Sequence, residues 1–142
     1  MMNQSITLII TGSIAAVKTF EIIALLKENG WTVHCCLTRN ALQWVSLNAV
    51  ELSSGQKAWV IENKLNKQLK QLLQNTARVL ICPASANVLA QTAHKQTWLA
   101  QVLFNLENAP IIAPAMNYKM WAHPAVQRNV TQLKQTGFLF AG

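Results

Sequence analysis

Residues 79–87 read VLICPASAN, and this stretch decides the fold because four apolar residues end abruptly at a proline turn. A short apolar run bounded by a turn predicts a strand that is buried on both faces. Comparable runs occupy positions 6–10, 31–37 and 111–113, and turns of small polar residues follow the first two. Strands that are apolar throughout are typical of a parallel sheet covered by helices on both sides.

Helical patterns separate these strands. Apolar residues recur at helical spacing over residues 15–29, 41–52, 64–74, 86–103 and about 125–136, with a break expected near Gln96. Asn29-Gly30 predicts a helix stop, residues 53–55 a turn, and residues 58–61 and 138–140 shorter strands. The alternation predicts a single α/β domain over residues 1–142. In such folds, ligands bind beyond the carboxyl ends of the strands.

The composition favours an oligomeric protein of the cytoplasm. Only 12% of the 142 residues are charged and 51% are hydrophobic, and that charged share is about half the typical value, so we expect apolar faces buried between subunits. No apolar stretch reaches the length of a membrane helix, and the amino terminus lacks the basic region of a signal peptide. An odd number of cysteines indicates reduced thiols. His34, Cys35 and Cys36 lie too close together for a convincing metal site.

The net charge of +7 makes nucleic acid an obvious candidate partner. The basic residues are scattered, however, and the densest group (Lys64, Lys67 and Lys70) has the spacing of a solvated helix face. Attraction of a phosphorylated small molecule is another option. The chain contains no Asp, which removes the usual carboxylate that holds magnesium in nucleotide hydrolases. We expect neither nucleic acid, nor a membrane, nor a metal ion as a partner.

The turn after the first strand is a near miss for a nucleotide-triphosphate loop. Residues 12–19 match G-x-x-x-x-G-K-[ST] except at Val17, whose branched side chain would obstruct the backbone around a phosphate. A dinucleotide fingerprint is excluded as well, because Gly12 stands alone. What remains is a turn that opens a helix. Ser13 can hold one phosphate group or merely cap the helix, and the sequence leaves both open.

Two later turns carry isolated amides. Residues 83–87 are apolar apart from Ser85 and Asn87. A carboxamide donates and accepts hydrogen bonds, which suits the imide edge of a flavin or a base, although Asn87 could equally cap a helix. Residues 114–121, PAMNYKMW, surround Asn117 with large apolar side chains. Because loops are usually polar, this one either packs on a neighbouring subunit or forms the wall of a pocket.

Together, these segments resemble the flavin-dependent cysteine decarboxylases, a family that acts on phosphopantothenoylcysteine or on lantibiotic peptides. The resemblance covers nearly the whole chain, and PASAN combined with PAMN-x-x-MW is specific. It rests on GSIAA at 12–16, TRNA at 38–41, PASAN at 83–87, PAMNYKMW at 114–121 and PA-x-Q-x-N at 124–129. It implies a Rossmann-like (flavodoxin-like) domain that binds FMN and assembles as a trimer or a multiple of trimers.

The resemblance also implies residue roles. Asn117 would bind the substrate carboxylate as a catalytic residue, with Met116 and Met120 shaping its pocket. An asparagine suits an anion because its amide donates without a buried counter-charge. Oxidation of the cysteinyl thiol by FMN gives a thioaldehyde, an electron sink that lets carbon dioxide leave. FMN itself would contact Gly12, Ser13, Ile14, Thr38, Trp44, Ser85, Ala86 and Asn87.

The chain departs from the family at three points. Relatives carry an active-site histidine in the helix before the PASAN strand, where this chain has none and Leu69 falls near the expected position. The family segment A-N-G-x-A-D is replaced by AHKQTW at 93–98, without its acid. Relatives also usually continue beyond residue 142 into a lid. His123, beside the substrate loop, is the best local substitute base, although a capping or surface role fits it at least as well.

The leading hypothesis is therefore an FMN-dependent decarboxylase of a cysteine-derived carboxylate. The favoured reaction converts phosphopantothenoylcysteine to phosphopantetheine in coenzyme A biosynthesis. One alternative is a peptidyl-cysteine decarboxylase. Another is a non-catalytic FMN-binding flavoprotein or regulatory subunit of the same family, which would depend on a histidine-bearing paralogue.

Overall fold

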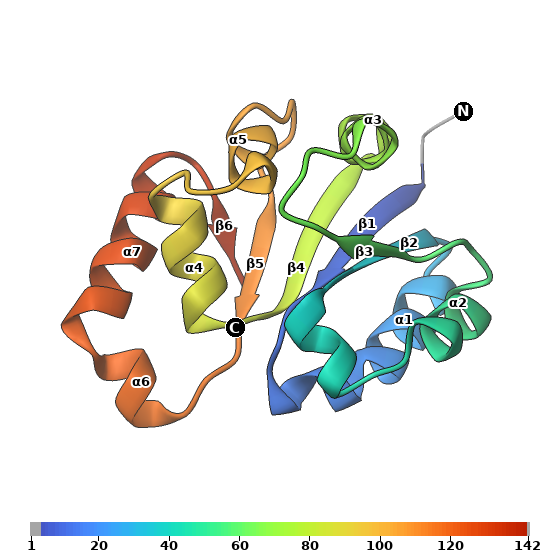
Figure 1. Cartoon of the computed structure of the whole chain (residues 1–142), viewed down its shortest axis with the longest axis horizontal. Coiled ribbons are helices and arrows are strands. Elements are labelled where there is room, and N and C mark those ends of the chain that lie inside the picture. Colours follow the sequence, from blue (N-terminus) through green and yellow to red (C-terminus); the bar gives the residue numbers. More distant parts are fainter. Residues whose placement is uncertain (1–3, 142) are drawn as a thin grey trace.

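The computed structural model describes residues 4–141 and places their strands in one six-stranded parallel sheet (Figure 1). The order across the sheet is β3-β2-β1-β4-β5-β6, which is the doubly wound order of Rossmann folds. The predicted α/β, Rossmann-like class is therefore confirmed. The strands are β1 (Ser5–Ile10), β2 (Thr32–Thr38), β3 (Trp59–Ile61), β4 (Arg78–Ala84), β5 (Ile111–Pro114) and β6 (Leu139–Phe140).

Helices cover both faces of the sheet and bury two separate apolar cores. On one face lie α1 (Thr19–Glu28) and α2 (Leu47–Ser54), which bury Ile23 and Val50. The opposite face carries α3 (Lys67–Asn75), α4 (Ala86–Ala93), α5 (Trp98–Phe104) and α7 (Pro124–Gln135). Shorter elements at the carboxyl edge of the sheet are the 3-10 helices η1 (Ile14–Lys18) and η2 (Arg39–Gln43), and α6 (Tyr118–Ala122).

The adjacent Cys35 and Cys36 show why consecutive positions of the strands are apolar in the sequence. Both are fully buried, but they belong to different cores, because successive side chains of a strand point to opposite faces. Burial raises the pKa of Cys35 to about 12 and also raises the pKa of Cys36. All three cysteines are free, and no metal-binding cluster occurs among the described residues. Nor is any helix in residues 4–141 long and apolar enough to cross a membrane.

Side-chain caps and a glycine stop set the helix boundaries, which confirm one prediction and correct two others. Thr97 accepts a hydrogen bond from the Ala100 amide and begins α5, which confirms the break expected near Gln96. Ser53 and Ser54 were predicted as a turn but lie in α2, and only Gly55, with φ of +74°, ends that helix. The segment 114–121 was expected to be a loop, yet Asn117 caps the short helix α6 within it.

Candidate functional site

The switch point of the sheet lies between β1 and β4, because the chain winds outward from these strands in opposite directions. Thr11 joins the two strand ends there. Its Oγ1 donates to the Pro83 carbonyl at 2.6 Å and accepts from the Ser85 amide at 2.9 Å. The Thr11 side chain is fully buried. Nothing in the sequence singled out Thr11, because its partners lie more than 70 residues away along the chain.

The other two turns are attached to the same point. The Ala115 amide at the start of the PAMN segment donates to the Ala84 carbonyl at 3.0 Å. Gly12 packs directly on Asn40 in the turn after β2, and a Cβ at position 12 would collide with the Cβ of Asn40. The four polar turns predicted at the strand ends therefore converge on one edge of the sheet.

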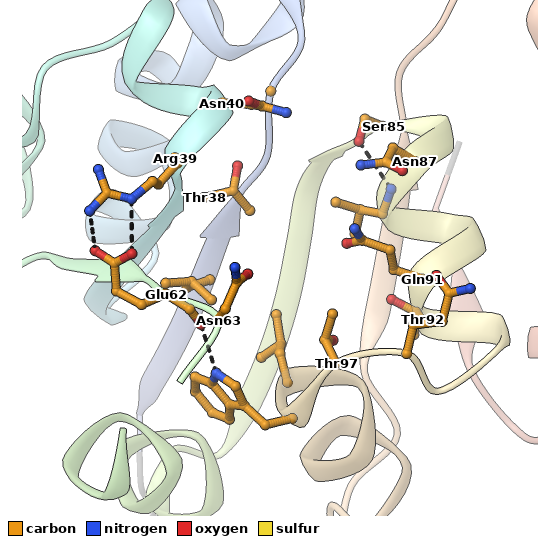
Figure 2. A pocket seen from close by; sticks show the side chains of 16 residues that line it. Thr38, Arg39, Asn40, Glu62, Asn63, Ser85, Asn87, Gln91, Thr92 and Thr97 are labelled. Carbon is orange, nitrogen blue, oxygen red and sulfur yellow. Dashed lines mark hydrogen bonds and ion pairs between the residues drawn. The ribbon is translucent and has the colours of Figure 1, made fainter. Parts of the chain in front are cut away.

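A cavity of about 400 Å³ opens at this edge, and we call it the switch-point cavity. Its walls come from the turns after β1, β2, β3 and β4, from α4, and from the segment before α5 (Figure 2). Of the residues expected to contact a flavin, it contains Gly12, Thr38, Ser85 and Asn87. Sequence reasoning missed the contributions of the turn after β3, of Gln91 and Thr92 on α4, and of Thr97.

Side-chain amides dominate the polar lining of this cavity. None of them hydrogen-bonds to another described residue, whereas Asn29, Asn66 and Gln132, which lie outside the cavity, bond to the backbone. Polar groups without an internal partner that converge on a concave surface are available to a ligand. In Figure 2, amides from α4 lie across the cavity from those of the other wall. The unbonded amides are Asn40, Asn63, Asn87, Gln91 and Gln96.

The caps bear on two questions that the sequence left open. Ser85 accepts from the Val88 amide and caps α4, so Asn87 is not the cap and its amide stays free. Ser13 does cap η1, through the Ala15 amide at 3.1 Å, and it is not part of the cavity lining. Thr38 both caps a helix and lines the cavity. Its Oγ1 accepts from the Ala41 amide at 3.3 Å at the start of η2.

Other predicted site residues lie outside the switch-point cavity. Ala86 is half-buried at the start of α4, while Ile14 is 69% exposed and Trp44 43% exposed. Met116 lines a second cavity of about 280 Å³, between α6, α7 and the end of β6, together with Trp121, Phe140 and Lys134.

Asn117 and Met120 are exposed on α6. The Asn117 Oδ1 accepts from the Met120 amide at 2.9 Å, which leaves the side-chain NH₂ group free to donate. Within one chain, the segment around Asn117 and Met120 therefore lies outside the cavity that Thr38 and Asn87 line.

Histidine is absent from the described lining of both cavities. Leu69, near the position where the resemblance expects it, is fully buried in the core under α3. The Nδ1 of His123 accepts from the Ala125 amide at 3.1 Å and caps α7, so only its Nε2 could exchange a proton with a substrate. His34 lies on β2, and burial lowers its pKa.

Comparison with known proteins identifies relatives across the whole chain. A family model described as Flavoprotein matches residues 1–142. A probable phosphopantothenoylcysteine decarboxylase of Streptococcus mutans is 33% identical, over 96% of this chain and 81% of that protein. The coenzyme A biosynthesis bifunctional protein CoaBC of Bacillus subtilis is 29% identical over 97% of this chain, which spans only 36% of that protein.

Solved structures share the fold. The FMN-dependent cysteine decarboxylase TvaF from thioviridamide biosynthesis superimposes with a TM-score of 0.83 and 27% identity, covering 97% of this chain and 89% of TvaF. The FMN-dependent cysteine decarboxylase SpaF superimposes with a TM-score of 0.84 and 28% identity, covering 96% of this chain and 82% of SpaF.

Proposed function

The chain belongs to the flavoprotein family, and on this premise we propose that it is an FMN-dependent decarboxylase of a cysteine-derived carboxylate. The favoured substrate is phosphopantothenoylcysteine, and the product is phosphopantetheine, a step of coenzyme A biosynthesis. Residues 1–142 would act as one FMN-binding domain. The S. mutans relative, matched over most of its length, supports this substrate.

The observation that carries the proposal is the set of unbonded amides around the switch-point cavity. The imide edge of a flavin presents carbonyl acceptors beside an N–H donor, and a carboxamide can serve either. Asn87 and Gln91 stand on α4, opposite Asn40 and Asn63, so a planar ring between them would find partners on both sides. Gly12 lets the turn after β1 pack against the turn after β2, because the close contact with Asn40 leaves no room for a Cβ.

Asn117 would bind the substrate carboxylate. Its Oδ1 is held by the Met120 amide, so the NH₂ group has a defined direction and no internal partner. Neutral donors bind a carboxylate without the cost of burying a second charge. Bound FMN would supply the two-electron oxidation of the cysteinyl thiol that makes loss of carbon dioxide possible, and the reduced flavin would return the two electrons to give phosphopantetheine. This chain would orient the carboxylate and exclude water through Met116 and Met120.

The site would be completed by neighbouring copies of the chain in a trimer or a multiple of trimers. Several exposed apolar side chains on or next to η1, η2 and α6, at the carboxyl edge of the sheet, support this assembly. They include Ile14 (69% exposed), Val17 (54%), Trp44 (43%), Tyr118 (83%) and Met120 (45%). A second subunit could thereby bring Asn117 to a flavin bound on the first. Free buried cysteines fit a location in the cytoplasm.

The test combines a visible spectrum, a mass in solution and a turnover assay on the purified protein. We expect a yellow protein with the mass of a trimer or its multiple, which releases carbon dioxide from phosphopantothenoylcysteine. A cysteine-terminated peptide serves as the second substrate, because TvaF and SpaF are named as cysteine decarboxylases. Release from the peptide alone would favour a peptidyl-cysteine decarboxylase. A colourless monomer would reject the FMN proposal altogether.

A non-catalytic flavoprotein or regulatory subunit is the second candidate, and one observation favours it. Leu69 is fully buried near the place of the family histidine, and no histidine lines either described cavity. A histidine-bearing paralogue would then complete the site in a mixed assembly. Flavin binding without turnover, with turnover restored by such a paralogue, would establish this candidate in place of the first.

A further inference from the structure

The switch-point cavity carries no net charge, although the whole chain carries +7. Arg39 and Glu62 are the only charged residues among the described residues that line it. They neutralise one another in an ion pair at 2.6 Å. A phosphate monoester carries a charge of about −1.5 to −2 near neutral pH. A phosphorylated ligand in this cavity would therefore meet no unpaired cation unless the pair opened.

The geometry of the pair matches the way a guanidinium binds phosphate. Arg39 donates to the two carboxylate oxygens of Glu62 through Nε at 2.8 Å and Nη2 at 2.6 Å. A planar guanidinium offers the same fork of parallel N–H groups to a phosphate. The Glu62 carboxylate therefore occupies the position that two phosphate oxygens would take.

The pair is also easy to open. The side chains of Arg39 and Glu62 are 71% and 47% exposed, and exposed ion pairs contribute only modestly to stability, with bidentate pairs such as this one among the stronger. The backbone of Glu62 is held separately, because its carbonyl accepts from Trp98 Nε1 at 2.8 Å. The carboxylate can therefore rotate away while the turn after β3 keeps its place beside α5. Figure 2 shows both interactions on the same wall of the cavity.

We propose that Arg39 is a phosphate anchor, and that Glu62 holds its guanidinium ready until a phosphorylated ligand displaces the carboxylate. Arg39 follows Thr38, so the anchor would lie beside a hydroxyl that already faces the cavity. The inference rests on the proposed function for the identity of the ligand. Two sources of phosphate share this chemistry: the FMN phosphate and the phosphate of the substrate.

The experiment compares flavins that differ only in the phosphate group. FMN and riboflavin are titrated into apoprotein by fluorescence quenching, with wild type, Arg39→Gln and Glu62→Gln. Arg128→Gln and Glu28→Gln are the matched controls, because they make the same changes in net charge at exposed positions outside both cavities. A second arm uses FMN-loaded protein and compares binding of phosphopantothenoylcysteine with that of pantothenoylcysteine.

Loss of a charge-assisted hydrogen-bond pair weakens binding by about tenfold to a hundredfold. In one of the two arms, we expect Arg39→Gln to weaken binding of the phosphorylated ligand by this factor. Binding of its unphosphorylated counterpart should not change. The Glu62 carboxylate competes weakly with the phosphate for Arg39. Glu62→Gln removes this competitor and should therefore bind the same phosphorylated ligand about fivefold more tightly. The arm that responds identifies the source of the phosphate.

Equal effects on phosphorylated and unphosphorylated ligands in both arms would overturn the phosphate anchor and leave the proposed FMN site intact. The same holds if the control variants reproduce the effects, since the response would then follow net charge alone. Absence of binding of either flavin to the wild type is a different result, because it would reject the proposed function and the anchor together.

Discussion

The Thr11 hydroxyl accepts a hydrogen bond from the Ser85 amide and ties the first turn of the sheet to the turn after β4. The same hydroxyl donates to the Pro83 carbonyl, so one buried side chain fixes both strand ends at the switch point. The side chain that holds the site together is therefore not one of those expected to contact a ligand.

Thr11→Val should lower the free energy of unfolding by about 1–3 kcal/mol, the usual cost of leaving a buried polar group without its partner. Valine keeps nearly the same shape but cannot bond to the Ser85 amide or the Pro83 carbonyl. Urea denaturation measures the change, and Thr11→Ser is the control because it keeps the hydroxyl. Equal stability of the valine and serine variants would contradict the role of the hydroxyl.

Gly12→Ala should push the first turn away from the turn after β2. The added Cβ collides with the Cβ of Asn40, and overpacking of this kind typically costs about 1–3 kcal/mol. We expect lower stability together with weaker flavin binding, measured by denaturation and by titration. Combining it with Asn40→Gly removes the colliding atom and should restore part of both losses; no recovery would mean that the turn fails for another reason.

Asn117 can be tested without disturbing the helix that it caps. Asp caps helices as well as Asn does, whereas Ala costs about 1 kcal/mol at such a position. Asn117→Asp should therefore keep the stability and the flavin spectrum, but lose turnover, because a carboxylate repels the substrate carboxylate. Turnover by Asn117→Asp at the wild-type rate would rule out carboxylate recognition by this residue.

Lys95 adopts a left-handed conformation, with φ of +53°, at the position where the family segment has glycine. A residue with a Cβ pays about 1–2 kcal/mol for this conformation. Lys95→Gly should therefore be more stable than Lys95→Ala by about 1 kcal/mol, which reverses the usual order for these two residues. Both variants lose the contact of Lys95 with the Phe104 ring, so it cancels from the comparison.

Stability should fall in alkali because two thiols are buried in the protonated state. Burial raises the pKa of Cys35 from 9.0 to about 12, and it raises the pKa of Cys36 as well. The unfolded chain loses these protons first, so the stabilisation is complete below pH 9 and is lost as the pH rises towards 12.

The expected slope is about 1.4 kcal/mol per pH unit for each thiol above pH 9. Urea denaturation of the wild type and of Cys35→Ala between pH 8 and pH 11 measures it. A slope that does not change on removal of Cys35 would show that this thiol ionises equally in the folded and unfolded chains.

The sequence alone determined the class of the fold. Runs such as 79–82 are apolar at every position and are bounded by turns, which is typical of a strand covered on both faces. The alternation with helical patterns then required a parallel sheet, and the break near Gln96 followed from local signals that the Thr97 cap confirms. The family motifs also lie in short contiguous segments, which makes them readable without knowledge of the fold.

Only the tertiary structure decided which of these segments share one cavity. Strand order brings Thr11 to Ser85, and Arg39 to Glu62, although 74 and 23 residues separate them along the chain. The sequence carries no trace of such pairs, because each side chain is ordinary in its own local context. Packing of α3 against the sheet likewise placed Leu69 in the core, and the turn after β3 left Asn63 at the cavity.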